Sequence, residues 1–158
     1  MARNTLFGNV ANPDNQRTMN RVDVSLFAYG TLRDREILEG VLGRAVPAAH
    51  LRDARADGWR TVYYPQRLYP ALVGGGSKAC GTLISGLDGT DIARLDEFEG
   101  DEYRLGPIAV TTEDGTLMAQ TYFPTGEIGP NAPLWSFETW TRLHKPATIA
   151  RYRAENFQ

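Results

Sequence analysis

The stretch VSLFAYGTL, residues 24–32, is the part of the sequence that decides the fold. Residues 24–29 are apolar at nearly every position, a pattern typical of a strand that is buried on both faces. Gly30 interrupts the pattern, and Asp34 then offers a side chain that can cap a helix. The apolar residues that follow are spaced by one, three and four positions, as in a helix; they are Ile37, Leu38, Val41 and Leu42.

Strand-like segments separated by turn residues dominate the region from Ala45 to Leu87. Residues 62–64, 69–73 and 80–87 combine apolar and β-branched residues and are bounded by proline or glycine. Gly74-Gly75-Gly76 is predicted to form a flexible turn between two of these strands. A phosphate-binding loop at this place is disfavoured because the Gly-Lys-Ser/Thr order and a following helix are both missing.

A hairpin is predicted around Glu113-Asp114-Gly115, which lies between strand-like residues 103–112 and 116–123. The Asp-Gly pair favours a tight turn because it readily takes the positive φ angles that such turns need.

Helical patterns are confined to three places. Besides the helix after Asp34, a short helix capped by Thr90 or Asp91 is expected, as is a helical stretch over residues 136–156 that Pro146 interrupts. Many short strands with few helices predict an α+β domain built around a mixed sheet or a small barrel.

Composition is that of an ordinary globular protein: 158 residues, 42% apolar and 23% charged, with a formal charge of −2. Basic residues do not cluster into a stripe, which argues against a nucleic-acid partner. No run approaches the roughly 20 apolar residues of a membrane span. One cysteine, Cys80, and the absence of a signal-peptide core favour a cytoplasmic location. Residues 1–22 are expected to form a poorly ordered arm, and residues 23–158 a single domain.

Glu99 stands out because of its place on the predicted short helix. On a helical wheel it falls between Ile92 and Leu95, on the apolar face, whereas Asp96 falls at the flank and Glu97 on the far side. Burial raises the pKa of a carboxyl group and suits it to proton transfer near neutral pH. Two structural alternatives remain open: Gly100 ends the helix and Glu99 turns to water, or Glu99 pairs with an arginine.

A second candidate site is Tyr29-Gly30-Thr31-Leu32, at the end of the buried strand. A glycine lets a ligand approach the backbone, the amides that follow can bind an anion, and Thr31 adds a hydroxyl group. The alternative is an ordinary turn between a strand and a helix.

Other reactive residue types carry less weight. His50 and His144 have no partner at metal-ligand spacing, so no metal site is predicted, and surface or interface positions are expected for them. Cys80 lies in an apolar strand without an adjacent base, so a packing role is expected.

The order of the motifs resembles the γ-glutamyl cyclotransferase-like superfamily, specifically its avirulence-induced-gene-like branch. The resemblance covers about residues 24–145. It rests on ordered matches along the chain, which are Phe27-Ala28-Tyr29-Gly30-Thr31-Leu32, Tyr69 to Leu72, Cys80-Gly81-Thr82-Leu83, Leu95-Asp96-Glu97-Phe98-Glu99-Gly100, Tyr103-Arg104, Tyr122 and Trp135 to Trp140. Thr31 stands where serine is commoner in the branch, and the hydroxyl group is kept.

This resemblance implies a mixed six-stranded β-barrel with flanking helices. It also implies a reaction in which the α-amine of a γ-glutamyl amine or γ-glutamyl amino acid attacks its own γ-carbonyl, giving 5-oxoproline. Glu99 would be the catalytic acid/base. Tyr29, Gly30, Thr31, Leu32 and Tyr122 would bind the substrate.

Such a reaction requires no metal or cofactor, and its partner is a small γ-glutamyl molecule. A monomer or weak homodimer is expected. Loops at residues 66–68 and 124–133 are predicted to contact the leaving group. Two other functions remain possible: a non-catalytic binding or stress-related module on the same fold, and a hydrolase in which Glu99 activates water.

Overall fold

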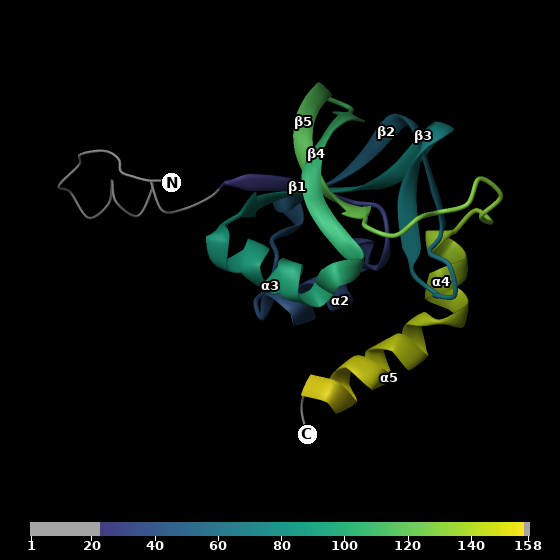
Figure 1. The fold of residues 1–158 in the computed structure, drawn as a ribbon. Helices are drawn as coiled ribbons and strands as arrows, with labels where there is room; N and C mark the ends of the chain where they lie inside the picture. The colour runs from purple at the N-terminus through teal and green to yellow at the C-terminus, as the bar shows by residue number, and fades with distance from the viewer. Residues whose placement is uncertain (1–22, 157–158) are drawn as a thin grey trace.

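A computed structural model describes residues 23–156, and the strands in this range form a closed barrel with helices gathered at one end (Figure 1). The strands are β1 (Val24–Ala28), β2 (Leu51–Tyr63), β3 (Pro70–Leu87), β4 (Tyr103–Thr112) and β5 (Gly115–Pro124). The helices are α2 (Arg35–Leu42), α3 (Gly89–Glu99), α4 (Phe137–Leu143) and α5 (Lys145–Asn156), with short 3-10 turns η1 (Thr31–Arg33), η2 (Ala48–His50) and η3 (Gly100–Glu102). The α+β class is confirmed, whereas the predicted arm over residues 1–22 lies outside the described residues.

The barrel in residues 23–156 has five strands instead of the predicted six, in the order β1-β3-β2-β4-β5. The difference arises at Gly74–Gly76, which lies within β3 and is not a turn between two strands. Gly75 has a φ of 95° and Gly58, on the paired strand β2, has a φ of 86°. The β2–β3 register shifts between Asp57 and Trp59. Glycines therefore let one long strand bend through a bulge where the sequence predicts a break.

Strand β1 is buried on both faces, as predicted. Leu26 and Ala28 pack with the helices, whereas Phe27 and Tyr29 point into the cluster inside the barrel. β1 pairs antiparallel with β3 and parallel with β5, which closes the mixed barrel. The buried hydroxyl of Thr121 donates a 2.7 Å hydrogen bond to the Phe27 carbonyl oxygen across this last seam.

Helix α2 begins as predicted, because the Asp34 carboxylate accepts a 3.1 Å hydrogen bond from the amide of Ile37. The predicted cap of α3 was wrong. Asp88 is its N-cap and Asp91 is the third helical residue, and each side chain accepts from the backbone of the other. This reciprocal capping box satisfies two amides that a single cap at Thr90 or Asp91 would leave open.

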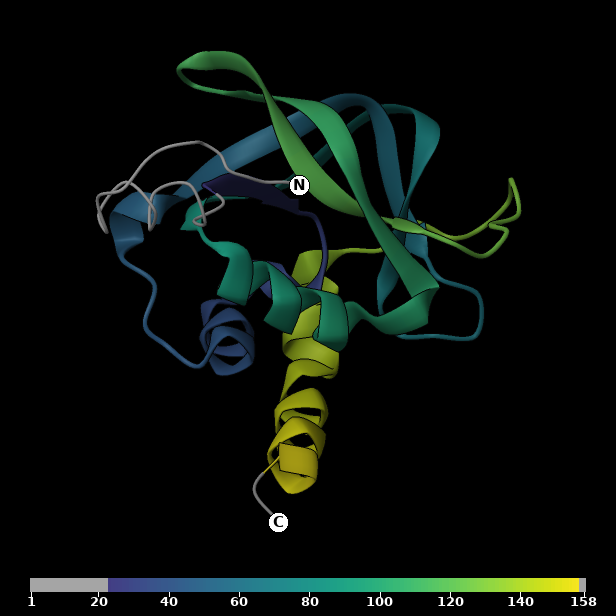
Figure 2. The same ribbon diagram turned by 60° about the vertical axis from the view of Figure 1, so that its left-hand side comes forward.

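The β4–β5 hairpin is confirmed, with Gly115 alone in its turn taking a positive φ, of 119°. Near the C-terminus, helix α4 ends at its C-cap His144 and α5 begins at Lys145. Pro146 therefore lies in the first turn of α5 and does not interrupt a helix. Proline is tolerated there because the first amides of a helix have no acceptor within it. Figure 2 shows α3 across the base of the barrel, with α4 and α5 continuing below it.

Candidate active site

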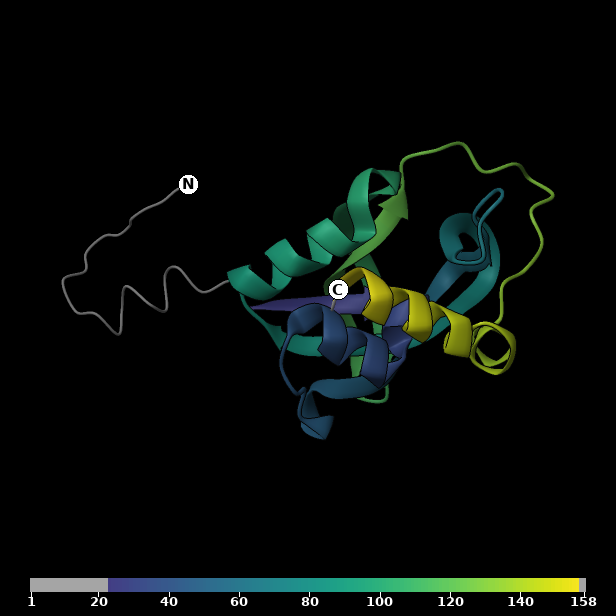
Figure 3. The same ribbon diagram turned by 90° about the horizontal axis from the view of Figure 1, so that it is seen from below.

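A cavity of about 460 Å³ lies between the helical end of the barrel and α3, α4 and α5. In the view from below, α5 crosses this end with α2 on one side and α3 on the other (Figure 3). The residues that line the cavity come from five parts of the chain. These are residues 26–32, residues 66–70, the group Phe98, Glu99, Glu102 and Tyr103 from the end of α3 to the start of β4, Tyr122 of β5, and the group Trp140, His144, Ala147, Thr148, Arg151, Tyr152 and Glu155 from α4 to α5.

The segment Tyr29–Leu32 enters the cavity because β1 ends at Ala28 and the turn η1 begins at Thr31. In this turn the amides of Arg33 and Asp34 donate to Gly30 and Thr31, whereas those of Thr31 and Leu32, at its start, have no acceptor within it. Gly30 also has a packing role that the sequence did not indicate. A Cβ atom at Gly30 would lie 2.8 Å from Cγ of Pro70, so the glycine allows Pro70 to pack against this turn.

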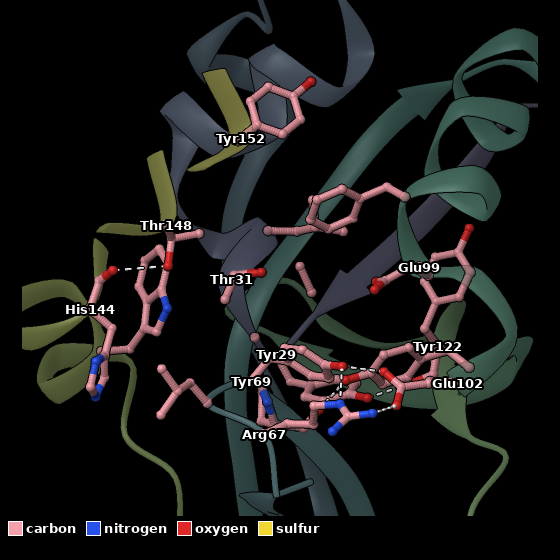
Figure 4. A pocket seen from close by; sticks show the side chains of 18 of the residues that line it. Tyr29, Thr31, Arg67, Tyr69, Glu99, Glu102, Tyr122, His144, Thr148 and Tyr152 are labelled. Carbon is pink, nitrogen blue, oxygen red and sulfur yellow. Dashed lines mark hydrogen bonds and ion pairs between the residues drawn. The ribbon is translucent and has the colours of Figure 1, made fainter. Parts of the chain in front are cut away.

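Glu99 extends from the end of α3 toward the middle of the cavity, with Thr31 on the opposite side (Figure 4). Its side chain is half-buried. Gly100 does end α3, with a φ of 68°, yet Glu99 remains in the cavity. Within residues 23–156, no hydrogen bond or ion pair reaches its carboxyl group. Neither structural alternative, a turn to water or an arginine pair, describes the position of Glu99.

The surroundings of Glu99 disfavour its charged form. Burial, and to a lesser extent the negative charge of Asp96, raise the pKa of Glu99 to about 8. Asp96 itself is exposed, and its Oδ1 accepts a 2.7 Å hydrogen bond from the Tyr122 hydroxyl. Glu97 is exposed as well, as the helical wheel predicted. A carboxyl group that exchanges its proton near neutral pH is therefore present at the centre of the cavity.

The tyrosines of the cavity have their hydroxyl groups engaged by protein oxygens. Tyr29 donates to the backbone oxygen of Tyr122, and Tyr103 donates to that of Pro70 at 2.6 Å. Burial, followed by the charge of Glu99, raises the pKa of Tyr29. These hydroxyl groups remain protonated, so the tyrosines shape the cavity and do not compete with Glu99 for proton transfer.

A polar cluster of Arg67, Tyr69 and Glu102 lies along another side of the cavity (Figure 4). Arg67 contacts the Tyr69 hydroxyl at 2.8 Å and a Glu102 carboxylate oxygen at 3.2 Å, and Tyr69 also donates to Glu102. Sequence reasoning predicted that residues 66–68 contact the leaving group, but it did not predict that Arg67 pairs with Tyr69 and Glu102. Tyr69 and Glu102 are 33 positions apart, and no local pattern signals that they meet.

Of the two loops predicted to contact the leaving group, only one lines the cavity. Residues 66–68 line the cavity as predicted, but residues 124–133 do not. The wall on that side comes from α4 and α5, because the long loop runs along β2 and pairs there through Val62 and Leu134. The cavity therefore has a helical wall that the sequence did not indicate.

All six predicted site residues line this one cavity: Tyr29, Gly30, Thr31, Leu32, Glu99 and Tyr122. His144 is half-buried and lines it too, whereas His50 does not. Cys80 is exposed, so its predicted packing role was wrong. Among residues 23–156, no group of three or more histidine, cysteine or acidic side chains is placed to hold a metal ion.

None of the helices described in residues 23–156 is both long and apolar enough to cross a membrane.

Comparison with known proteins identifies a family whose members this chain resembles. The family model described as gamma-glutamyl cyclotransferase, AIG2-like, matches residues 26–142. AIG2-like protein A of Arabidopsis thaliana is 26% identical over 133 residues, which cover 82% of this chain and 79% of the relative. A solution structure of another Arabidopsis thaliana protein is 26% identical, with a TM-score of 0.62 over 83% of this chain and 89% of its own. A structure named gamma-glutamyl cyclotransferase has a TM-score of 0.56 at 17% identity, over 66% of this chain and 68% of its own, and shows the shared fold.

Proposed function

The chain belongs to the gamma-glutamyl cyclotransferase, AIG2-like family, and from this premise we propose that it converts a γ-glutamyl amine or γ-glutamyl amino acid to 5-oxoproline and a free amine. The observation that carries the proposal is the position of Glu99. Its carboxyl group has no protein partner within residues 23–156 and faces Thr31 across one cavity.

In the proposed reaction, Glu99 takes a proton from the substrate's α-ammonium group. The freed amine attacks the γ-carbonyl carbon, a C–N bond forms, and the five-membered ring closes. The original amide C–N bond then breaks as Glu99 returns the proton to the leaving nitrogen; the ring nitrogen gives up its second proton as well, which ends on the leaving amine, so that this amine departs as an ammonium group. One group serves as base and then acid, so no net proton is consumed by the enzyme.

The pKa of Glu99 supports this role. An ordinary glutamate has a pKa of about 4.3, far below that of any α-amino group, and burial and Asp96 raise the pKa of Glu99 to about 8, which narrows this gap. Proton transfer between two groups of similar pKa is nearly balanced in free energy, which favours a general acid/base. An ordinary exposed glutamate would be too weak a base for an ammonium group.

The segment Tyr29–Leu32 would hold the substrate. The first amides of the turn and the Thr31 hydroxyl would be donors suited to an α-carboxylate or to the oxygen that gains charge during attack. Ring closure needs a folded γ-glutamyl chain, and contacts with the tyrosines of the cavity would hold the chain in that geometry.

The direct test is Glu99→Gln, assayed with a panel of γ-glutamyl compounds by mass spectrometry of the products. We expect loss of 5-oxoproline release with an unchanged fold by circular dichroism. Glu97→Gln is the matched control, because it removes an exposed carboxylate two positions away and should retain activity.

Three results would contradict the proposal. Substantial turnover by Glu99→Gln would remove Glu99 from the mechanism. Free glutamate as the product would indicate a hydrolase. Binding of γ-glutamyl compounds without any product would indicate a non-catalytic binding module.

A further inference from the structure

Helix α5 forms a wall of the cavity but lies outside the residues that match the family model. The match ends at residue 142, whereas α5 runs from Lys145 to Asn156. Its residues Ala147, Thr148, Arg151, Tyr152 and Glu155 nevertheless line the cavity. This wall is therefore a place where the chain can differ from its relatives in what the cavity accepts.

Several contacts fix α5 in position. The Tyr152 hydroxyl donates a 2.8 Å hydrogen bond to the Gly40 carbonyl oxygen of α2, and its ring packs against the same glycine. Lys145 lies 2.7 Å from Asp34, and Arg153 lies 3.0 Å from Glu36. Both ends of the helix are thereby tied to α2, so the side chains of α5 have defined places at the cavity.

The two arginines that line the cavity differ in whether they have an ion-pair partner. Its two guanidinium groups belong to Arg67 and Arg151. Arg67 is bound to Glu102 and to Tyr69. Arg151 has no ion pair or hydrogen bond with the residues that the structure describes. Glu155, one helical turn further, also lines the cavity, but the Arg-to-Glu order at this spacing is the less favourable one for a helix pair.

Apolar residues line the same cavity as Arg151. Phe98, Trp140, Ala147 and Tyr152 line it together with Thr148. The volume, about 460 Å³, lies within the range of about 300–1,000 Å³ that holds drug-sized ligands, which leaves room beyond a γ-glutamyl group. This combination suits a leaving group with an apolar side chain and one negative charge.

We propose that Arg151 is a specificity-determining residue that selects γ-glutamyl conjugates of apolar α-amino acids over conjugates of neutral amines. Its guanidinium group binds the carboxylate of the leaving amino acid, a planar pairing that guanidinium groups make well. The selection rests on the proposed cyclotransferase function, because it concerns the group that leaves the γ-carbonyl.

The test compares γ-glutamylphenylalanine with γ-glutamylphenethylamine, which differ only in the leaving-group carboxylate. Binding of both is measured by titration calorimetry in the Glu99→Gln background, so that turnover does not interfere. We expect the carboxylate compound to bind about three- to fivefold more tightly, the size of an exposed ion pair. Adding Arg151→Gln should equalise the two affinities by weakening only the carboxylate compound. The preference should also shrink at high salt.

Arg153→Gln is the matched control. It removes the same charge from the same helix, but Arg153 pairs with Glu36 and does not line the cavity. The preference should survive this substitution. Equal affinities before any change at Arg151, equal weakening of both compounds by Arg151→Gln, or loss of the preference in Arg153→Gln would each overturn the inference.

Turnover by the unsubstituted protein separates this inference from the proposed function. Release of 5-oxoproline from both compounds at equal efficiency, with equal binding, refutes the role of Arg151 and leaves the cyclotransferase standing. A carboxylate preference in binding without any 5-oxoproline refutes the cyclotransferase reaction alone. Failure of both compounds to bind contradicts both.

Discussion

The Tyr122 hydroxyl donates a 2.7 Å hydrogen bond to Oδ1 of Asp96, three positions before Glu99. This bond orients the carboxylate whose charge adds to the effect of burial on the pKa of Glu99. Tyr122 was predicted to bind substrate. Its ring does line the cavity, but its hydroxyl proton is committed to Asp96. We therefore propose that Tyr122 acts on the site by positioning a charge.

Asp96→Asn should lower the pKa of Glu99 from about 8, because a nearby negative charge disfavours ionisation of a second carboxyl group. Burial, the larger cause, remains, so the pKa should stay above its ordinary value. The acid limb of the pH profile of kcat/KM is expected to move to lower pH. Glu97→Gln is the control, since Glu97 does not contribute to the shift; an equal displacement in both variants would show that Asp96 has no specific effect.

Glu99→Gln should make folding stability less dependent on pH. Because the pKa of Glu99 is raised in the folded state, the folded protein holds this proton until about pH 8 and the unfolded chain loses it near its ordinary value. Stability of the natural protein thus falls between these pH values. Each pKa unit corresponds to about 1.4 kcal/mol, so the glutamine variant should be a few kcal/mol more stable at about pH 9 and similar at about pH 4. Urea unfolding at both values measures this, and parallel curves would exclude a buried titration.

Gly30→Ala should destabilise the protein by about 1–3 kcal/mol and lower kcat/KM. The new methyl group would lie 2.8 Å from Pro70, and one of the two must move. The carbonyl oxygen of Pro70 also accepts a hydrogen bond from the Tyr103 hydroxyl, so a movement of Pro70 would displace Tyr103 in the cavity wall as well. Gly74→Ala is the control, because nothing lies within 4 Å of its added methyl group. Thermal unfolding and steady-state kinetics decide the matter: similar losses in both variants would assign the effect to strand propensity.

Asp34 caps α2 and pairs with Lys145 of α5, and three variants separate the contributions of the cap and of the ion pair to stability. Asp34→Ala removes both the helix cap and the 2.7 Å pairing with Lys145, and should cost about 1–3 kcal/mol. Asp34→Asn keeps a capping oxygen and should lose less than about 1 kcal/mol, as should Lys145→Gln. Denaturant unfolding of the three variants gives these values. A loss in Asp34→Asn as large as in Asp34→Ala would show that the charge, and not the cap, sustains this contact.

Sequence reasoning reached the parts of the site that local patterns govern. The place of Glu99 follows from its phase on a short helix, and Tyr29–Leu32 follows from the end of a strand whose two faces are both apolar. Both depend on periodicities of a few residues. The glycine run in β3 misled the prediction because the same residues serve a turn and a bulge equally well.

The rest of the cavity depends on contacts between distant residues. Tyr152 meets Gly40 across 112 positions, and this contact places α5 over the cavity. Most residues of α5 are exposed or half-buried, and its sequence has no pronounced apolar face. Its pattern therefore did not indicate where the helix would dock. The pairing of Arg67 with Glu102 likewise has no local signal. Such arrangements arise only once the whole chain is packed.

The parallel seam between β1 and β5 has a consequence for how the site comes into being. Phe27 and Thr121, whose hydrogen bond spans this seam, are 94 positions apart, so closing the barrel at this seam costs loop-closure entropy. Tyr29–Leu32 follows β1 directly, and any local opening that detaches β1 would carry this segment away from Glu99. Assembly of the proposed active site thus depends on the docking of β1 into the barrel. The stability of the site against local opening is therefore the free energy that holds β1 between β3 and β5.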